Sequence, residues 1–191
     1  RLFLYSIQMK KTHLTDTRFI NLELSKSILK GLQDAGFDQC SPIQEQSLPI
    51  ALRDRDVAGQ AQTGTGKTAS FLLAVFQRLL NDNSEKKKYP RAIILAPTRE
   101  LAIQIHKDAL LLGKHLGFNL ALIYGGTDYQ KQLKAVQGNV DIIIATPGRI
   151  IDFYRQKAFS LDNIQVMVLD EADRMFDLGF IKDIRYLLNR M

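Results

Sequence analysis

The sequence has almost no cysteine and no long apolar run. Cys40 is the single cysteine among 191 residues, so the chain cannot form an internal disulfide, and without Cys or His pairs at ligand spacing a zinc site is not expected. No apolar run approaches the roughly 20 residues that a membrane-spanning helix requires. Residues 2–7 are too short for the core of a typical signal peptide. These absences favour a reducing, cytoplasmic location and give no reason to expect a membrane partner.

The sequence also lacks the composition of a disordered chain. Hydrophobic residues make up 46% of it and charged residues 24%, which is typical of folded globular domains. Its length suits one compact domain. The net charge of +6 permits contact with a polyanion, but many proteins that bind no nucleic acid share such a charge. The composition therefore indicates a folded domain and leaves its ligand open.

The two ends of the chain and its polar segments suggest simple boundaries. Arg1 is not a natural start and Met9 is the first methionine, so we expect residues 1–8 to be a non-native leader and residues 9–191 to form one domain. Residues 81–90 are polar and end in proline, which predicts an exposed loop. The three histidines have no acidic companion at useful spacing, and we expect them to be surface or packing residues.

Short runs rich in Val, Ile and Leu alternate with longer segments of helical spacing. We expect strands within residues 56–59, 91–97, 119–125, 140–146 and 165–171, and helices within residues 67–80, 100–116, 129–137 and 148–156. Consecutive apolar residues indicate strands that are buried on both faces. The alternation predicts an α/β fold with a mainly parallel sheet and helices on both faces. In such sheets ligands bind at the carboxyl ends of the strands.

A glycine-rich segment, AQTGTGKT, follows the first predicted strand and precedes an apolar helical segment. Gly64 and Gly66 allow a tight turn whose amides, with the positive end of the helix dipole, bind phosphate. Lys67 is placed to reach the β and γ phosphates, and the Thr68 hydroxyl to ligate Mg²⁺. Ala61 stands where the general pattern has glycine. A glycine turn without a ligand is the alternative, which the lysine and threonine disfavour. The predicted nucleotide-binding residues of this loop are Ala61, Gln62, Thr63, Gly64, Thr65, Gly66, Lys67 and Thr68.

The run VMVLDEAD supplies the acidic partner that such a loop requires at the end of another strand. Asp170 is placed to hold Mg²⁺, usually through water, and Glu171 to polarise a water for attack on the γ phosphate. The alternative is that Asp170, Glu171 and Asp173 only begin the next helix, where acidic residues are favoured. The phosphate loop upstream favours a catalytic role, with Lys67, Asp170 and Glu171 as the catalytic residues. This interpretation requires Lys67 and Thr68 to meet the acidic pair at one triphosphate.

Residues 170–173 spell DEAD, and the chain from Phe19 onward resembles the first RecA-like domain of the DEAD-box RNA helicases, with the family's motifs in the expected order. The resemblance implies a RecA-like P-loop domain that binds ATP and Mg²⁺ and contacts RNA. Residues 36–44, GFDQCSPIQ, are similar to the family's Q motif. This implies that the Gln44 amide reads the adenine edge and that Phe19 stacks on the ring. A core or surface aromatic is the alternative for Phe19.

Three further segments are similar to RNA-side motifs of the family. PTRELA at residues 97–102 is similar to motif Ia, residues 125–126 to the GG element, and TPGR at residues 146–149 to motif Ib. Each follows a predicted strand, where hydroxyls, amides and an arginine can grip phosphate and sugar oxygens with little sequence preference. A structural ion pair or helix cap is the alternative for the two arginines. The implied RNA-binding residues are Pro97, Thr98, Arg99, Gly125, Gly126, Thr146, Gly148 and Arg149.

Within the family, residues 11–15 and 173–185 look most like a bacterial member that works with ribonuclease E in RNA decay. In that bacterial member, the contact with ribonuclease E is attributed to the second RecA-like domain. We expect that domain, and the family's Ser-Ala-Thr motif, to lie beyond Met191. The chain itself is therefore expected to bind nucleotide without unwinding RNA.

Three other functions are compatible with parts of this pattern. A GTPase or small-molecule kinase would share the phosphate loop, but a guanine reader of the Asn-Lys-x-Asp type does not occur in the sequence. A non-catalytic RNA-binding scaffold with a vestigial nucleotide site is the second, and the intact Lys67, Asp170 and Glu171 disfavour it. A DNA helicase of related architecture is the third, and only the family resemblance favours RNA over DNA.

Overall fold

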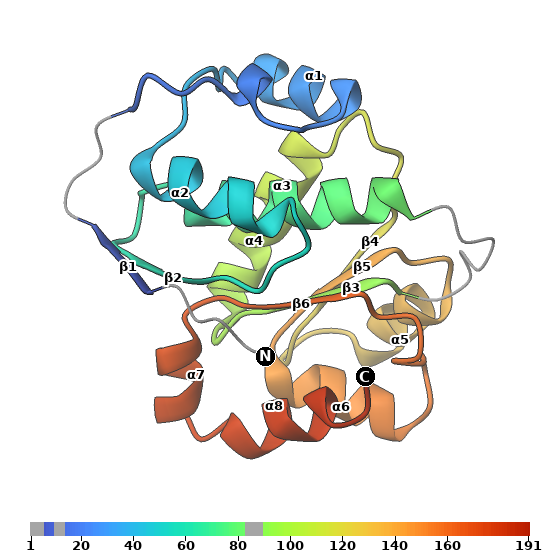
Figure 1. Ribbon diagram of the computed structural model, residues 1–191. Coiled ribbons are helices and arrows are strands. Elements are labelled where there is room, and N and C mark those ends of the chain that lie inside the picture. Colours follow the sequence, from blue (N-terminus) through green and yellow to red (C-terminus); the bar gives the residue numbers. More distant parts are fainter. Residues whose placement is uncertain (1–5, 10–13, 83–89) are drawn as a thin grey trace. The chain divides into compact units, whose positions relative to one another are not determined.

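A computed structural model describes residues 6–9, 14–82 and 90–191 of the chain (Figure 1). These residues fold as two compact units. Unit 1 comprises the described residues of Arg1–Asp82 and Asp108–Gly117, and unit 2 comprises the described residues of Asn83–Lys107 and Phe118–Met191. Most of the expected leader, most of the loop expected at residues 81–90, and His13 lie outside the described residues.

Unit 1 holds the segment that precedes and follows the glycine-rich loop. Its elements are β1 (Ser6–Met9), the 3-10 helix η1 (Phe19–Asn21), α1 (Lys26–Asp34), α2 (Pro42–Ala51), β2 (Ala58–Ala61) and α3 (Lys67–Asn81). The Ser25 hydroxyl caps α1 by accepting a hydrogen bond from the Ile28 amide at 3.4 Å, and Pro42 occupies the first turn of α2, where its missing N–H costs nothing. β1 and β2 pair in parallel.

Close helix contacts hold unit 1 together. A Cβ on Gly31 of α1 would lie 2.1 Å from the Leu112 carbonyl oxygen, so only glycine allows this approach. The hydroxyls of Ser47 on α2 and Ser70 on α3 are hydrogen-bonded at 3.0 Å. Both serines are buried. Their mutual hydrogen bond offsets the free-energy cost of removing the two hydroxyls from water.

Unit 2 is built on a four-stranded parallel sheet of order β4-β5-β3-β6. The strands are β3 (Ala92–Leu95), β4 (Leu120–Ile123), β5 (Ile142–Ala145) and β6 (Val166–Leu169). The helices are α5 (Tyr129–Gln137), α6 (Pro147–Arg155), α7 (Ala172–Asp177) and α8 (Ile181–Leu188), while α4 (Arg99–Leu112) begins in unit 2 and ends in unit 1. Ala92–Leu95 and Ile142–Ala145 are fully buried, as their unbroken apolar sequences predict.

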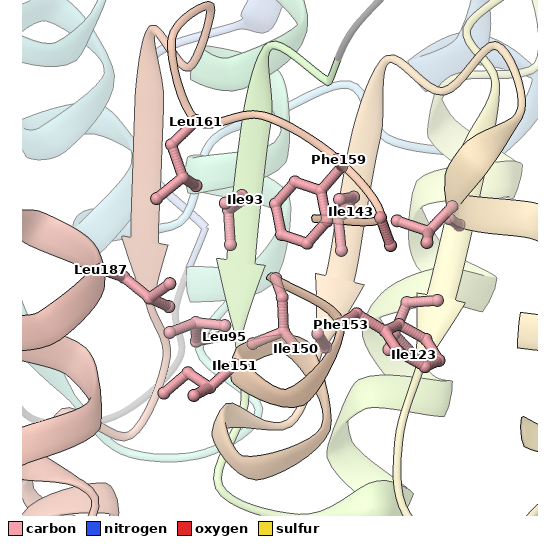
Figure 2. Packing of buried hydrophobic residues seen from close by; sticks show 14 of the residues in the cluster. Ile93, Leu95, Ile123, Ile143, Ile150, Ile151, Phe153, Phe159, Leu161 and Leu187 are labelled. Carbon is pink, nitrogen blue, oxygen red and sulfur yellow. The ribbon is translucent and has the colours of Figure 1, made fainter. Parts of the chain in front are cut away.

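The core of unit 2 lies between one face of the sheet and α5, α6, α7 and α8. Ile93, Leu95 and Ile143 of the sheet pack against Ile150 and Phe153 of α6, and these side chains point toward one another in Figure 2. The cluster also includes Ala121, Ile123, Val136, Val140, Ala145, Ile151, Ala158, Phe159, Leu161, Met175, Ile184 and Leu187. Burial of each large apolar side chain stabilises the fold by about 1.5–3 kcal/mol before the loss of chain entropy.

An ion pair fixes the amino ends of the central strands. Arg91 precedes β3 and Asp141 precedes β5, and their side chains meet at 2.6 Å with Arg91 only 3% exposed. The other carboxylate oxygen of Asp141 accepts the Asn119 amide at 2.9 Å. This network therefore joins the starts of β3, β4 and β5 at the edge opposite to their carboxyl ends.

The predicted α/β class and parallel sheet are confirmed, and each predicted helix is present within a few residues of its expected ends. The expectation of a buried strand at residues 56–59 is wrong. The strand spans Ala58–Ala61 and its first three residues are exposed, because AGQA offers little apolar side chain to bury.

The histidine prediction needs one correction. The fold brings Asp34 to His115, with 2.8 Å between the carboxylate oxygen and Nε2, and places the Lys114 amine 3.3 Å from the same oxygen. The His115 ring, and secondly Lys114, lower the pKa of Asp34. The two partners are 81 positions apart in the chain, so local spacing could not reveal the pair.

None of the helices in the described ranges combines the length and apolarity that crossing a bilayer demands.

Candidate functional site

The glycine-rich loop connects β2 to α3 in unit 1. Gly64 and Gly66 have φ values of 81° and 90°, the left-handed region that glycine enters without strain. The Thr65 hydroxyl donates to the Gln62 carbonyl at 2.7 Å, and the Lys67 amine donates to the Ala61 carbonyl. A Cβ on Gly64 would meet no atom within 4 Å. The loop is thus a preformed turn, open at Gly64, at the amino end of a 15-residue helix, and this fits a phosphate group.

Gln44 ties the segment similar to the Q motif to this loop. Its Oε1 accepts the Ser41 amide at 2.8 Å and its Nε2 donates to the Gly66 carbonyl at 3.1 Å. Gln44 is 3% exposed. An amide side chain has two N–H donors and two acceptor lone pairs, and these two bonds use one of each. The role of Gln44 in reading adenine stays a prediction.

Phe19 lies in η1 and is 2% exposed. It packs as a core side chain, which was the alternative to a stacking platform. Stacking on an adenine would require its ring to become accessible, and this role also stays a prediction.

The acidic motif lies where β6 ends and α7 begins, in unit 2. The Asp170 amide donates to the Leu95 carbonyl at 3.0 Å, which extends the pairing of β6 with β3 by one residue. Glu171 has φ 51° and ψ 50°, a left-handed conformation that is uncommon for a residue other than glycine. Its carboxylate lies 3.3 Å from Arg174, three residues on. Sequence reasoning assigned no role to Arg174.

The sheet brings four motifs to one edge. Leu95 is in register with Ala145 and with Leu169, and Ala145 with Ile123. Because all four strands are parallel, the residues that follow them leave the same edge. In spatial order these are the GG element after β4, motif Ib after β5, motif Ia after β3 and the acidic motif after β6. Neighbouring strands are about 4.8 Å apart, so three strand spacings separate the GG element from Asp170 by roughly 14 Å.

Motif Ia begins α4. Pro97 is buried, and the Thr98 hydroxyl accepts the Leu101 amide at 3.3 Å, as a helix cap does. The exposed Arg99 places its guanidinium 4.9 Å from the centre of the Tyr124 ring. Tyr124 directly precedes the GG element, so this contact joins motif Ia to it.

The GG element is an exposed turn between β4 and α5. Gly126 has φ 81°, and a Cβ on either glycine would meet nothing within 4 Å. Gln132 of α5 anchors the turn, because its side-chain amide forms hydrogen bonds with the backbone N–H and C=O of Tyr124 and with the Thr127 hydroxyl. Backbone amides in an open turn of this kind can donate hydrogen bonds to an anionic oxygen.

Motif Ib begins α6. Thr146 is the N-cap residue, its amide bonds to the Ile123 carbonyl at 3.0 Å, and Gly148 is exposed. The Arg149 guanidinium lies 5.0 Å from the centre of the Tyr129 ring and 5.8 Å from that of Phe153. Neither arginine therefore follows the alternative of an ion pair or a helix cap in the part of the chain that the structure describes.

No group of three or more His, Cys, Asp or Glu side chains among the described residues could hold a metal ion alone. Mg²⁺ does not require such a group, because it is usually held by one or two carboxylates together with phosphate oxygens and water. The Asp170 carboxylate and the Thr68 hydroxyl are oxygen ligands of the kind it prefers.

Comparison with known proteins identifies the family. Residues 41–191 match the model of the DEAD/DEAH box helicase family. The chain is 61% identical over 183 residues to the ATP-dependent RNA helicase RhlB of Pseudoalteromonas atlantica, covering 96% of this chain and 44% of that protein. It is 59% identical over 187 residues to RhlB of Xanthomonas oryzae, covering 96% and 33%. The chain thus spans less than half the length of these relatives.

Solved structures agree with this result. The crystal structure of a DEAD box protein from Methanococcus jannaschii superimposes with a TM-score of 0.83 at 39% identity, covering 94% of this chain and 47% of that one. The structure of a hypothetical ATP-dependent RNA helicase from Sulfolobus tokodaii superimposes with a TM-score of 0.79 at 30% identity, covering 88% and 47%. The fold of the chain is therefore the one seen in these proteins.

Proposed function

Since the chain belongs to the DEAD/DEAH box helicase family, we propose that it is the ATP-binding domain of an ATP-dependent RNA helicase, which couples ATP binding and hydrolysis to local unwinding of RNA duplexes. The observation that carries this proposal is the alignment of four motif-bearing strand ends at one sheet edge. Relatives with at least 57% identity bear the name ATP-dependent RNA helicase RhlB, which supports it independently.

Residues of unit 1 would bind the nucleotide. The loop from Ala61 to Gly66 would offer backbone amides to the phosphates, and Lys67 would neutralise their charge once it leaves the Ala61 carbonyl. The Gln44 amide has a donor and an acceptor left for the adenine edge. The bond from Gln44 to Gly66 would then link the occupant of the adenine site to the phosphate loop.

The predicted metal ligands and Glu171 would act on the reacting groups. Bound Mg²⁺, held by the Thr68 hydroxyl and the Asp170 carboxylate, would neutralise charge on the phosphates. Glu171 would orient a water molecule and accept its proton. The left-handed backbone of Glu171 sets the direction in which its side chain leaves the chain. The contact with Arg174 then orients the carboxylate group.

The same sheet edge would hold RNA by its backbone. Thr98, Thr146 and the two open glycines of the GG element offer hydroxyls and amides, and Arg99 and Arg149 offer positive charge. Phosphate and sugar contacts carry no base information. We therefore expect little sequence preference.

The wider setting of the chain is a further part of this proposal. We propose that the chain belongs to a cytoplasmic protein of bacterial mRNA decay, that residues 9–191 are its first RecA-like domain and residues 1–8 a leader, and that the remaining length of the RhlB relatives corresponds to a second RecA-like domain. That second domain would supply transition-state arginines and the contact with ribonuclease E. A scaffold with a vestigial nucleotide site is the alternative.

Replacement of Glu171 in the full-length protein tests this function. We expect Glu171→Gln to reduce RNA-stimulated ATP turnover by at least about a hundredfold while ATP affinity stays within about threefold, because the amide keeps the shape but cannot accept the proton. Turnover is followed as phosphate release and affinity with a fluorescent ATP analogue. Glu23→Gln, the same exchange at an exposed carboxylate outside the predicted site residues, serves as the matched control.

The outcomes separate the alternatives. A wild-type protein without ATP turnover supports the scaffold and contradicts the proposal. Equal stimulation by RNA and by single-stranded DNA of one sequence contradicts an RNA-specific function, and a preference for GTP over ATP contradicts the nucleotide assignment.

A further inference from the structure

The turn between β4 and α5 is fastened by one buried side chain that sequence reasoning did not single out. Gln132 is 8% exposed. Its Oε1 accepts the Tyr124 amide at 2.9 Å, and its Nε2 donates to the Tyr124 carbonyl at 3.0 Å and to the Thr127 hydroxyl. The side-chain amide thus pairs with both backbone groups of Tyr124, as a neighbouring strand would. The backbone from which the Tyr124 ring projects is fixed as a result.

Two tyrosines flank this turn, and each lies beneath an arginine of a neighbouring motif. The Arg99 guanidinium is 4.9 Å from the centre of the Tyr124 ring, and that of Arg149 is 5.0 Å from the centre of the Tyr129 ring. Both distances fall within the roughly 6 Å of a cation–π contact. Phe153 packs edge-on against Tyr129 with 5.0 Å between ring centres, and this holds the second ring in place.

Within the described ranges, this kind of support leaves both arginines without a carboxylate partner. Arg91 and Arg18, by contrast, face Asp141 and Asp38 at 2.6 and 2.7 Å. Among the described residues, no ion pair involves Arg99 or Arg149. One terminal nitrogen of Arg149 is buried and without a hydrogen-bond partner within those same residues. A guanidinium that rests on a ring keeps its N–H donors for another acceptor.

We propose that Tyr124, Tyr129 and Gln132 are positioning residues for RNA binding: the two rings pre-orient Arg99 and Arg149 toward successive phosphates of one strand, and Gln132 fixes the turn that carries them. This inference rests on the proposed function, because it assumes that both arginines contact RNA. Pre-orientation lowers the entropy lost when a long side chain is immobilised on its ligand. It should therefore change RNA affinity and leave nucleotide binding and the chemical step alone.

Ring removal in the full-length protein tests the proposal. We expect Tyr124→Leu and Tyr129→Leu each to raise the concentration of a fluorescein-labelled oligouridylate needed for half-maximal ATP turnover by about two- to fivefold, with kcat at saturating RNA and ATP affinity unchanged. Tyr124→Phe keeps the ring and should behave as wild type. Gln132→Met, which keeps the volume and removes the amide, should match Tyr124→Leu in RNA affinity, and melting temperatures verify that each variant is folded.

A double-mutant comparison separates positioning from a general structural effect. In an Arg99→Gln background the ring has no guanidinium to orient, so Tyr124→Leu should then weaken RNA binding by less than about 1.5-fold. An equal loss in both backgrounds would overturn the inference. So would equal behaviour of Tyr124→Leu and Tyr124→Phe.

Failure of the inference can be distinguished from failure of the proposed function. If Arg99→Gln and Arg149→Gln bind the oligouridylate as tightly as wild type, RNA contact at this edge is refuted and the inference with it. If both arginine variants bind weakly while the leucine variants bind normally, only the positioning role is refuted.

Discussion

At the residue scale, Glu171 combines an uncommon backbone with a defined side-chain partner. A left-handed conformation costs a non-glycine residue about 1–2 kcal/mol, and such residues persist where the surroundings over-determine them, often at functional sites. Glu171 is held on one side by β6 and on the other by the first turn of α7, with Arg174 on its carboxylate. The strain is thus located at the residue to which the proposed reaction assigns proton transfer.

Cys40 is a second residue whose surroundings set its chemistry. Burial, and secondly the charge of Glu45, raise the pKa of the Cys40 thiol to about 11. The thiolate is the reactive form, so at about pH 8 only about one thiol in a thousand is ionised. We expect Cys40 in the folded chain to react with a disulfide reagent at least a hundred times more slowly than in denaturant, as measured by absorbance of the released thiolate.

The raised pKa of Cys40 also determines how the stability of the fold changes with pH. Between pH 9.0 and about 11 the unfolded chain loses this proton before the folded chain does. The free energy of unfolding should therefore fall as the pH rises through this interval. Rapid labelling of the folded chain near neutral pH would contradict the buried position of Cys40.

At the element scale, the amino ends of the central strands serve stability, whereas their carboxyl ends carry the motifs. The amino ends of β3 and β5 are fixed by the buried pair of Arg91 and Asp141, with Asn119 bonded to the same carboxylate. The carboxyl ends of β3 and β5 lead into motif Ia and motif Ib, which begin α4 and α6. The sheet is therefore held at one edge while the other edge presents the motifs.

The buried pair gives a stability prediction. Asp141→Ala leaves the Arg91 charge buried without its carboxylate, and we expect a loss of about 3–5 kcal/mol in the free energy of unfolding, measured by urea denaturation. The double variant Arg91→Met with Asp141→Ala removes that charge and should recover more than half of the loss. Asp38→Ala, which breaks the exposed pair with Arg18, is the control and should cost less than about 1 kcal/mol. A similar loss in Asp141→Ala and Asp38→Ala would contradict this account.

At the scale of the whole molecule, the chain spans 44% of the Pseudoalteromonas relative. The proposed reaction assigns transition-state arginines to the remaining part, a contribution worth orders of magnitude in related NTPases. We expect the chain of 191 residues alone to bind ATP weakly, to turn it over negligibly and to unwind no RNA duplex. Calorimetry with ATP and a fluorescent unwinding assay measure this, with the full-length protein as the positive control. RNA-stimulated turnover by the chain alone would contradict the expectation.

Much of the fold and the family could be predicted because the signals are local. The apolar runs at residues 92–95 and 142–145 predict buried parallel strands, and AQTGTGKT followed by an apolar helix predicts a phosphate loop. The helices α1 and α2 were not predicted, and the strand after Asp56 was expected to be buried. Local signals for both helices are nevertheless present, because α1 has an apolar face at helical spacing after Ser25 and α2 begins with Ser41 and Pro42. For AGQA no such signal exists, and tertiary contacts decide its form.

In the candidate site, too, some features could be predicted from the sequence and others could not. The sequence by itself determined which residue types stand at the strand ends, because glycine, lysine, acidic and arginine motifs are contiguous and each carries its own chemistry. Their convergence on one nucleotide stays a prediction. Only the tertiary structure decided that the Arg99 and Arg149 guanidinium groups rest on Tyr124 and Tyr129, and that Gln132 fastens the turn between them. The physical reason is that these contacts join different strands and helices of the sheet edge, whose register is set by the packed core and not by neighbours in the chain.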